Sequence, residues 1–199
     1  MAVGLRHDFE RMAQWIPAAS QVLDLGCGDG ELLRFLREWR GIKISYGVEI
    51  DERNVLRCLQ NGINVIQSDL DAGLSMFEDQ SFDVVILSQT IQAVRHTESI
   101  VSEMLRVGRE VIVSFPNFGH WSHRLQIALG RMPVSDRLPY DWHNTPNIHL
   151  CTMVDFEQFC ADRQIKILDC CALNQGKPQK FLPNMFATLA VYRLCKASG

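Results

Sequence analysis

The chain has 199 residues, a formal net charge of −3, 47% apolar residues and 22% charged residues. These values are ordinary for a globular protein long enough to form one domain with a hydrophobic core. The slight acidic excess argues against a nucleic-acid-binding or anionic-membrane protein, because both are usually basic. No stretch reaches the ~18 apolar residues of a membrane span, and the charged first residues do not resemble a secretory signal. We therefore expect a cytoplasmic protein with neither nucleic acid nor membrane as a partner.

The cysteines indicate a reducing environment. There are seven of them, an odd number, and no two form a Cys-x-x-Cys pair. A disulfide framework or a thiolate zinc site requires more regular spacing. We therefore predict reduced thiols and no metal site, with Cys27 as a small packing residue.

Apolar runs typical of strands alternate with helical patterns along the first 115 residues. The predicted strands are 21–26, 43–50, 63–69, 81–88 and 109–115. The predicted helices are 31–39, 51–62 and 96–108, with inward residues Leu32, Leu36 and Trp39, then Val55, Leu56 and Leu59, then Ile100, Met104 and Val107. Such alternation predicts a parallel sheet joined by right-handed crossovers and covered on both faces.

Residues 116–150 interrupt this pattern. They hold four of the seven prolines and four of the six histidines. Residues 120–130 have the pattern of a short helix, and the rest reads as an ordered loop. Long loops within a domain are commonly functional. We treat 1–199 as one domain in which 116–150 is an insertion that forms a substrate pocket or a partner surface.

The regular pattern resumes after residue 150. Thr152 and Asp155 have the spacing of a capping box for a helix through residue 163. Two more strands, 165–173 and 185–194, follow with no helix pattern between them. We therefore expect these two strands to be antiparallel neighbours.

Three glycines, Gly26, Gly28 and Gly30, follow the first predicted strand. Glycine allows a sharp turn and lets a ligand approach the backbone, while the following helix points its free N–H groups at the loop. Glu49 ends the second strand, where it could accept hydrogen bonds from a ribose, and Asp69 ends the third, where it could accept from an amine. Each acid alone could simply be solvated. Together, at one edge of a parallel sheet, they predict a nucleotide-type site.

The glycine spacing bears on which nucleotide binds. A dinucleotide loop has the spacing G-x-G-x-x-G, whereas here the third glycine comes one residue early. Asp24 also precedes the loop, and a carboxylate suits a cationic or zwitterionic group better than a pyrophosphate. An NAD-dependent oxidoreductase remains an alternative that the spacing disfavours.

The motifs "DLGCGDG", "GVEID" and "QSDL" resemble those of the class I S-adenosylmethionine-dependent methyltransferases. This resemblance implies an α/β, Rossmann-like class I methyltransferase fold. The sheet of that fold has seven mostly parallel strands, the last one antiparallel, with helices on both faces. It also implies S-adenosylmethionine or S-adenosylhomocysteine as cofactor.

The resemblance assigns roles to matching positions around the methionine end of the cofactor. Gly26, Gly28 and Gly30 would line the methionine moiety. Asp24 would hold its amino group, and Ser88, followed by Gln89, would border the methyl group.

A second group of positions matches the nucleoside end. Glu49 would bind the ribose hydroxyls. Ile50 would pack on the adenine, although it could equally be a buried strand end. Asp69 would take the adenine amine, with the Leu70 backbone beside it.

No residue can be assigned a catalytic role from the sequence. The Pro-Pro-aromatic signature of nucleic-acid amine methylases is missing after the fourth strand, which reads "LSQTIQAV". Candidate polar and aromatic residues in the insertion are His120, His123, Tyr140, Asp141, Trp142, His143, Asn147 and His149. Its aromatic residues could wall a pocket or anchor a partner protein.

The stretches "VLDLGCGDGELL", "LSQTIQAV", "YDWHNTPNIHL" and "DFEQFC" together resemble the bacterial MetW family of methionine biosynthesis proteins. This resemblance implies a protein that works beside the homoserine O-acyltransferase MetX as an accessory or regulatory subunit. The alternative is an active S-adenosylmethionine-dependent methyltransferase acting on an unidentified small molecule.

Overall fold

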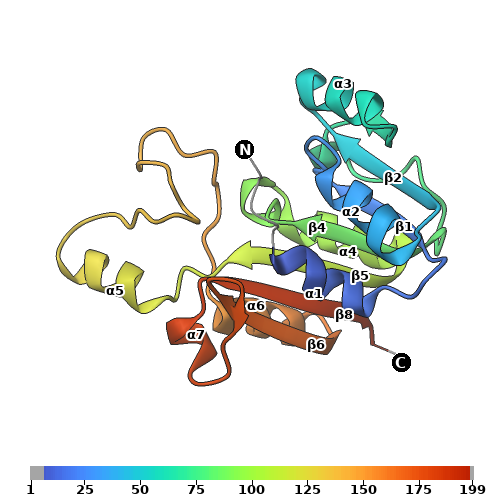
Figure 1. The fold of residues 1–199 in the computed structure, drawn as a ribbon. Helices are drawn as coiled ribbons and strands as arrows, with labels where there is room; N and C mark the ends of the chain where they lie inside the picture. Colours follow the sequence, from blue (N-terminus) through green and yellow to red (C-terminus); the bar gives the residue numbers. More distant parts are fainter. Residues whose placement is uncertain (1–6, 198–199) are drawn as a thin grey trace.

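The computed structural model describes residues 7–197 and is an α/β structure built on one mixed sheet (Figure 1). The strands are β1 Gln21–Leu25, β2 Ile44–Glu49, β3 Asn64–Gln67, β4 Phe82–Ser88, β5 Gly108–Pro116, β6 Ile165–Asn174, β7 Lys177–Pro178 and β8 Leu189–Lys196. The helices are α1 His7–Trp15, α2 Glu31–Arg40, α3 Glu52–Gln60, α4 Thr97–Val107, α5 Trp121–Ala128, α6 Met153–Asp162 and α7 Pro183–Phe186, with short 3-10 turns η1 Leu70–Ala72 and η2 Ile91–Ala93.

The strand order is β3-β2-β1-β4-β5-β8-β6-β7. Strands β1 to β5 are parallel, and β8 lies antiparallel between β5 and β6. The predicted fold class and the reversed final strand are confirmed, but the sheet has eight strands rather than seven. The additional β7 is a two-residue strand that forms because the chain reverses at Gln175 and Gly176, both with left-handed backbone (φ 48° and 78°).

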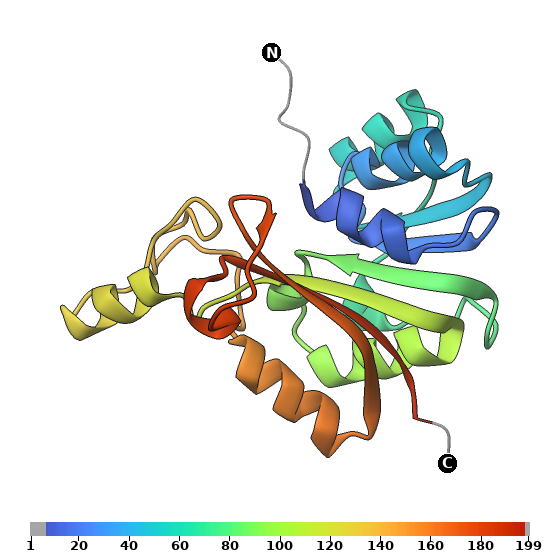
Figure 2. The same ribbon diagram turned by 60° about the horizontal axis from the view of Figure 1, so that its bottom comes forward.

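The sheet carries one hydrophobic core on each face. Figure 2 shows the helices on the two sides of the sheet. Helices α4 and α6 cover one face, and α1, α2 and α3 cover the other. Alternation along β4 shows how the sequence supplies both, since Val85 and Leu87 enter the first core while Val84 and Ile86 enter the second. Because successive side chains point to opposite faces, a strand buried on both sides is a continuous apolar run, as β4 is.

The inward face predicted for α3 is wrong. Cys58 is fully buried, whereas Leu56 and Leu59 are 52% and 58% exposed. The helix α3 lies at the edge of the sheet, where it packs against β2 and the edge strand β3. Only a narrow stripe of α3 therefore contacts the sheet. Trp39 of α2 is also exposed, and it stacks on Phe35 instead of entering the core.

Two boundaries near the end of the chain are informative. The predicted capping box of α6 is confirmed, because Asp155 N donates to Thr152 Oγ1 (3.2 Å) and Thr152 N donates to Asp155 Oδ2 (3.1 Å). The last strand starts at Leu189, later than predicted. Pro183 begins the short helix α7 in the residues before it, where proline at the first helical position is favourable.

Within residues 7–197, every helix is too short or too polar to span a bilayer.

Candidate functional site

The glycine loop joins β1 to α2 and is fastened to the end of β2. The N–H groups of Gly26 and Cys27 both donate to the Val48 carbonyl, at 2.8 and 3.1 Å. Gly26, Gly28 and Gly30 all have positive φ, at 67°, 58° and 80°. The three glycines therefore allow a left-handed turn that other residues adopt only with strain.

The three glycines meet different surroundings. A Cβ on Gly26 would lie 2.7 Å from Thr90 Cγ2, and one on Gly30 would lie 2.9 Å from Ile63 Cγ1. Glycine is therefore required at these two positions because neighbouring side chains leave no room for a Cβ. A Cβ on Gly28 would meet nothing within 4 Å. Gly28 is thus the glycine whose backbone faces open space, where a ligand could approach it.

Glu49 lies beside this open position with its carboxylate held by backbone N–H groups. Gly28 N donates to Oε2 at 2.8 Å, and Ile50 N and Asp51 N donate to Oε1 at 2.9 Å. The side chain is only 8% exposed, so the three bonds fix its orientation. A carboxylate has about four acceptor positions, which leaves capacity for a ligand hydroxyl. A negative charge at this position disfavours a pyrophosphate on the loop.

The residues predicted for the nucleoside end lie after β2 and β3, at the same edge of the sheet. Ile50 is 61% exposed, so the alternative of a buried strand end is wrong. Asp69 is exposed, and its Oδ1 caps η1 by accepting from Asp71 N at 2.9 Å. Leu70 is half-buried and packs against the core. An exposed apolar side chain and an exposed carboxylate therefore stand at the ends of adjacent strands.

The residues predicted for the methionine end lie on β1 and β4, which are adjacent. Asp24 is 2% exposed and is level with Ile86 of β4 in the strand register. Ser88 Oγ lies 3.4 Å from Ser114 Oγ of β5. The structure thus gathers the predicted positions at the carboxyl edge of the parallel strands, where folds of this class bind ligands.

Two residues at this edge were missed in the sequence. Asp8 of α1 is 1% exposed and accepts from Gln89 Nε2 at 3.0 Å, so α1 is tied to the end of β4. Thr90 packs against Gly26, as described above. An acidic residue in a first helical turn usually serves the helix dipole at the surface. Nothing in the local sequence therefore distinguishes Asp8 as buried.

Cys27 and Cys58 form a buried thiol pair beneath the loop, with their sulfurs 3.8 Å apart. Cys58 Sγ also donates to the Gly28 carbonyl at 3.2 Å. Burial raises the pKa of both thiols, so they remain protonated near neutral pH. Their surroundings agree with a packing role for Cys27.

Residues 118–150, which we call the arm, leave the end of β5 and project from the sheet (Figure 1). The predicted helix in this segment is confirmed as α5. The arm is folded upon itself, because Gln126 exchanges two hydrogen bonds with the Val134 backbone (3.1 and 3.2 Å). Its returning end is fastened to η2, where Ile148 N and His149 N donate to the Gln92 carbonyl at 2.7 and 3.0 Å.

Of the four candidate histidines, all of which lie in the arm, His120 and His123 are buried. His123 Nε2 is 2.9 Å from Ser135 Oγ, and His120 Nδ1 is 2.8 Å from Ser122 Oγ. Burial lowers the pKa of both imidazoles, so they are neutral at pH 7. Across residues 7–197, no group of three or more His, Cys, Asp or Glu side chains is placed to hold a metal ion. These histidines therefore serve the arm's own structure.

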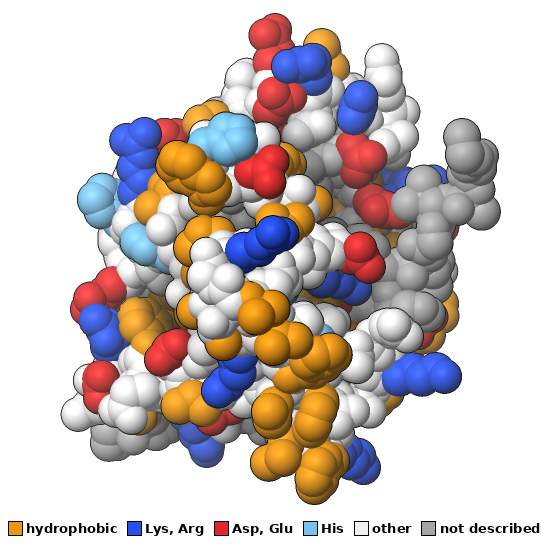
Figure 3. All heavy atoms as spheres, turned by 90° about the vertical axis from the view of Figure 1, so that its left-hand side faces the viewer, with side chains coloured by type: hydrophobic (Ala, Val, Ile, Leu, Met, Phe, Trp, Pro, Cys, Tyr) orange, Lys and Arg blue, Asp and Glu red, His pale blue; other side chains and the backbone are white. Residues whose placement is uncertain are grey.

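The outer surface of the arm is hydrophobic. Its exposed large apolar side chains are Trp121, Leu125, Ile127, Leu129, Met132, Val134, Tyr140, Trp142, Ile148 and Leu150. Figure 3, which views the side toward which the arm projects, shows hydrophobic side chains gathered on this face. In α5 the buried side chain is His123, while the exposed ones are largely apolar. This reverses the usual pattern of a surface helix.

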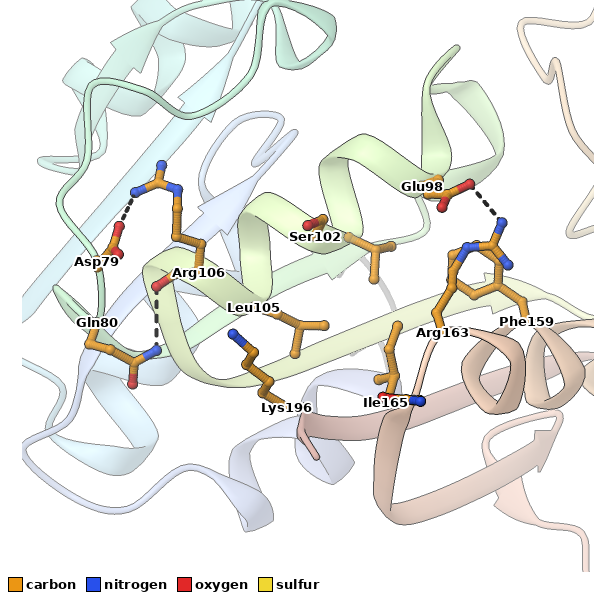
Figure 4. Close-up of a pocket in the computed structure, with 12 residues that line it drawn as sticks. Asp79, Gln80, Glu98, Ser102, Leu105, Arg106, Phe159, Arg163, Ile165 and Lys196 are labelled. Atoms are coloured by element: carbon orange, nitrogen blue, oxygen red, sulfur yellow. Dashed lines mark hydrogen bonds and ion pairs between the residues drawn. The ribbon is translucent and has the colours of Figure 1, made fainter. Parts of the chain in front are cut away.

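A separate groove of about 730 Å³ lies between α4 and α6 (Figure 4). It is at the opposite edge of the sheet, where β4 and β6 begin. Arg163 pairs with Glu98 at 2.6 Å and lies over the Phe159 ring, and Arg106 pairs with Asp79 at 2.7 Å. These two arginines are therefore already paired within the protein.

Comparison with solved structures agrees with the fold. A chain from the complex of the Trm112 methyltransferase activator with a methyltransferase of Haloferax volcanii superposes with a TM-score of 0.71 and 14% identity, over 96% of this chain and 90% of that one. An S-adenosylmethionine-dependent methyltransferase from Mesorhizobium loti gives a TM-score of 0.70 and 15% identity, over 96% of this chain and 98% of that one. At these identities the similarity shows the fold alone.

Comparison of sequences shows the family. The bifunctional methionine biosynthesis protein MetXA/MetW of Rhodopirellula baltica is 40% identical over 174 residues, which is 83% of this chain but only 28% of that protein. The chain therefore spans little more than a quarter of that relative. The family model described as methionine biosynthesis protein MetW matches residues 6–194. The chain belongs to the MetW family of methionine biosynthesis proteins.

Proposed function

We propose that this chain binds S-adenosylmethionine, or its demethylated product, at the glycine loop and acts as a regulatory subunit of a homoserine O-acyltransferase. The observation that carries the ligand assignment is the Glu49 carboxylate, which is fixed by three backbone N–H groups beside the open face of Gly28. It offers an oriented acceptor for a ribose diol.

The surrounding residues fit the same molecule. Ile50 is apolar and exposed next to Glu49, which suits the face of an adenine. Asp69 adds a carboxylate at the end of the adjacent strand for the adenine amine. Asp24 and Glu49 together make the loop acidic, which suits the ammonium and sulfonium of this ligand better than a pyrophosphate. When bound, S-adenosylmethionine carries a transferable methyl group on its sulfonium.

The partner assignment is supported by the name of the Rhodopirellula baltica relative. That protein is called bifunctional MetXA/MetW, and this chain matches 28% of it. Joining two functions in one polypeptide places them at a high effective concentration. We infer that this chain has the same partner, an acyltransferase of the MetX type.

A series of contacts between the glycine loop and the arm supports regulation of the acyltransferase by the ligand. Thr90 packs against Gly26 of the loop and precedes η2, and the Gln92 carbonyl in η2 holds the returning end of the arm. A ligand that shifts the loop would therefore shift the attachment of the arm. Such coupling must act in both directions, so a bound partner would also change ligand affinity.

Titration calorimetry with S-adenosylmethionine, S-adenosylhomocysteine and NAD tests the ligand assignment. We expect binding of an adenosyl sulfur compound and not of NAD. Glu49→Gln should weaken binding at least tenfold, because the amide presents an N–H group where a backbone N–H now donates. Glu52→Gln removes the same charge from the nearby first turn of α3 and should change affinity less than twofold. Equal affinities for the two variants would contradict the assignment.

Regulation is tested with the homoserine O-acyltransferase encoded in the same genome. Adding this chain should change the acyltransferase rate, and S-adenosylmethionine should alter that change for wild type but not for Glu49→Gln. A rate that ignores the ligand would remove the sensing role and leave a scaffold. A rate that ignores the chain would overturn the regulatory proposal.

The fold neighbours named as methyltransferases favour a second candidate, methyl transfer to a small molecule. The arm leaves the sheet beside the proposed methyl position, where an acceptor would have to lie. Accumulation of S-adenosylhomocysteine with a defined small-molecule acceptor would support this candidate. Its absence across a broad set of alcohols, amines and thiols would count against it.

A further inference from the structure

The arm and the adjoining segment 175–186 carry hydrophobic side chains that the described part of the chain does not cover. On the arm, Leu129 and Trp142 are 71% and 75% exposed, and on the other segment Phe181 and Leu182 are 70% and 54% exposed. With Trp121 and Leu125 of α5 these residues define what we call the apolar face. Exposed apolar area of this kind marks a surface that another molecule covers.

The two segments adjoin at the root of the arm. Asn117 Nδ2 donates to the carbonyls of Asn184 and Ala187, at 3.0 and 2.9 Å. A Cβ on Gly119 would lie 2.9 Å from the Asn184 backbone oxygen, so the two backbones are in close contact. Helices α5 and α7 accordingly lie next to each other in both ribbon views (Figures 1 and 2).

The apolar face is displayed by a structure that is already ordered. The hydrogen bonds from Gln126 to Val134 and between His123 and Ser135 hold α5 against the loop that follows it. Ordering is therefore achieved by polar contacts within the arm, while the apolar groups point outward. Little conformational entropy would remain to be lost when a partner binds, which favours affinity.

The size of the face suits a protein rather than a small ligand. A large aromatic side chain offers roughly 150–250 Å², so six side chains that are mostly half-exposed or more present several hundred Å². The stable interfaces of protein complexes bury about 800 Å² per partner. Tryptophan is also among the residues that dominate binding energy at interfaces.

The charge of the two segments indicates which partner chemistry would be complementary. The arm and segment 175–186 together hold five Lys or Arg and two Asp, although the whole chain has a formal net charge of −3. Arg124, Arg131 and Arg137 lie on the arm, and Lys177 and Lys180 on the other segment, where Lys180 also lines a hollow beside Arg11 and Trp15 of α1. A second copy of this chain would bring like charges together if the same faces met. An apolar surface with an acidic rim on a different protein is complementary.

We propose that the apolar face is the docking surface for the homoserine O-acyltransferase, which would present an apolar patch rimmed by acidic residues. This inference rests on the proposed function for the identity of the partner. It adds the surface by which the partner is held, at the same sheet edge as the glycine loop.

The test measures binding of the acyltransferase from the same genome by biolayer interferometry. Leu129→Asp and Trp142→Ser should each raise the dissociation constant at least tenfold. The matched controls are Leu59→Asp on α3 and Trp39→Ser on α2, which are 58% and 51% exposed and lie away from the arm. These controls should stay within twofold of wild type. Arg131→Glu should weaken binding and reduce its dependence on salt, whereas Arg57→Glu on α3 should do neither.

Each other outcome has a defined meaning. Wild-type affinity in both arm variants would overturn the docking surface and leave the partnership intact. No binding of wild type to the acyltransferase would overturn the partnership itself, and the docking surface with it. If light scattering showed that the chain alone is a dimer and that Leu129→Asp dissociates it, a second copy would be the occupant and the proposal would be wrong. Unchanged calorimetric binding of S-adenosylmethionine by the arm variants would show that they fold.

Discussion

The glycine loop and the arm leave the same edge of the sheet, but they differ in which groups are buried. At the loop, polar groups are paired within the protein, whereas on the arm apolar side chains are left exposed. At the loop, the carboxylate of Glu49 at the end of β2 accepts a backbone hydrogen bond from Gly28, whose surroundings are open, while Gly26 and Gly30 are packed. In the arm, a histidine is buried while Trp142 and Leu129 face outward. The loop is thus organised by the sheet before a ligand arrives. The arm is ordered but incomplete, because its hydrophobic surface can be buried only by another molecule.

The largest effect that would sharpen this comparison is expected from Gly30→Ala. The new Cβ would lie 2.9 Å from Ile63 Cγ1 at a φ of +80°, which combines backbone strain with overpacking. Together these should lower the free energy of unfolding by about 3 kcal/mol. Urea unfolding measures this loss.

Gly41→Ala is the matched control. Gly41 has a φ of +68° and nothing within 4 Å of the added Cβ, so only backbone strain of about 1 kcal/mol is expected. Equal losses in the two variants would mean that packing at Gly30 contributes nothing.

Gly28→Ala should separate binding from stability. Its φ of +58° and open surroundings predict the same modest loss of stability as Gly41→Ala. The methyl group would stand in the space assigned to the ligand, so affinity for S-adenosylmethionine should fall at least tenfold. If calorimetry finds unchanged affinity, the ligand binds elsewhere and the open position at Gly28 is not the ligand site.

The smallest expected effect concerns the pH dependence of the arm. Burial lowers the pKa of His120 and His123, so the unfolded chain binds protons more readily than the folded chain. Stability is therefore complete above the ordinary pKa of about 6.5 and falls as the pH drops below it. Each histidine contributes at most about 1.4 kcal/mol per pH unit.

His123→Gln tests this prediction, because the amide can still bond to Ser135 Oγ but does not titrate. The free energy of unfolding between pH 7.5 and 5.5 should vary less in this variant than in wild type. Hydrogen exchange in the arm should show the same difference. An unchanged slope would mean that His123 does not titrate on unfolding.

Much of the fold was predictable because burial on both faces requires continuous apolar runs in the central strands. The consecutive valines and isoleucines of β4 and β5 form such runs. The pattern weakens at the edges of the sheet. There Leu56 and Leu59 have helical spacing but no second layer to bury them. The last strand, predicted from residue 185, begins only at Leu189, after the short helix that starts at Pro183.

By itself, the sequence determined the glycine turn, the acids that end β2 and β3, the capping box at Thr152 and the family. Each of these depends on residues close together in the chain or on a motif. Tertiary structure alone decided which glycine faces open space, that Asp8 is buried against Gln89, and that the arm turns its hydrophobic residues outward. Those features depend on contacts between segments far apart in sequence. The spacing of residues along the chain does not determine which side chains those distant segments will bury.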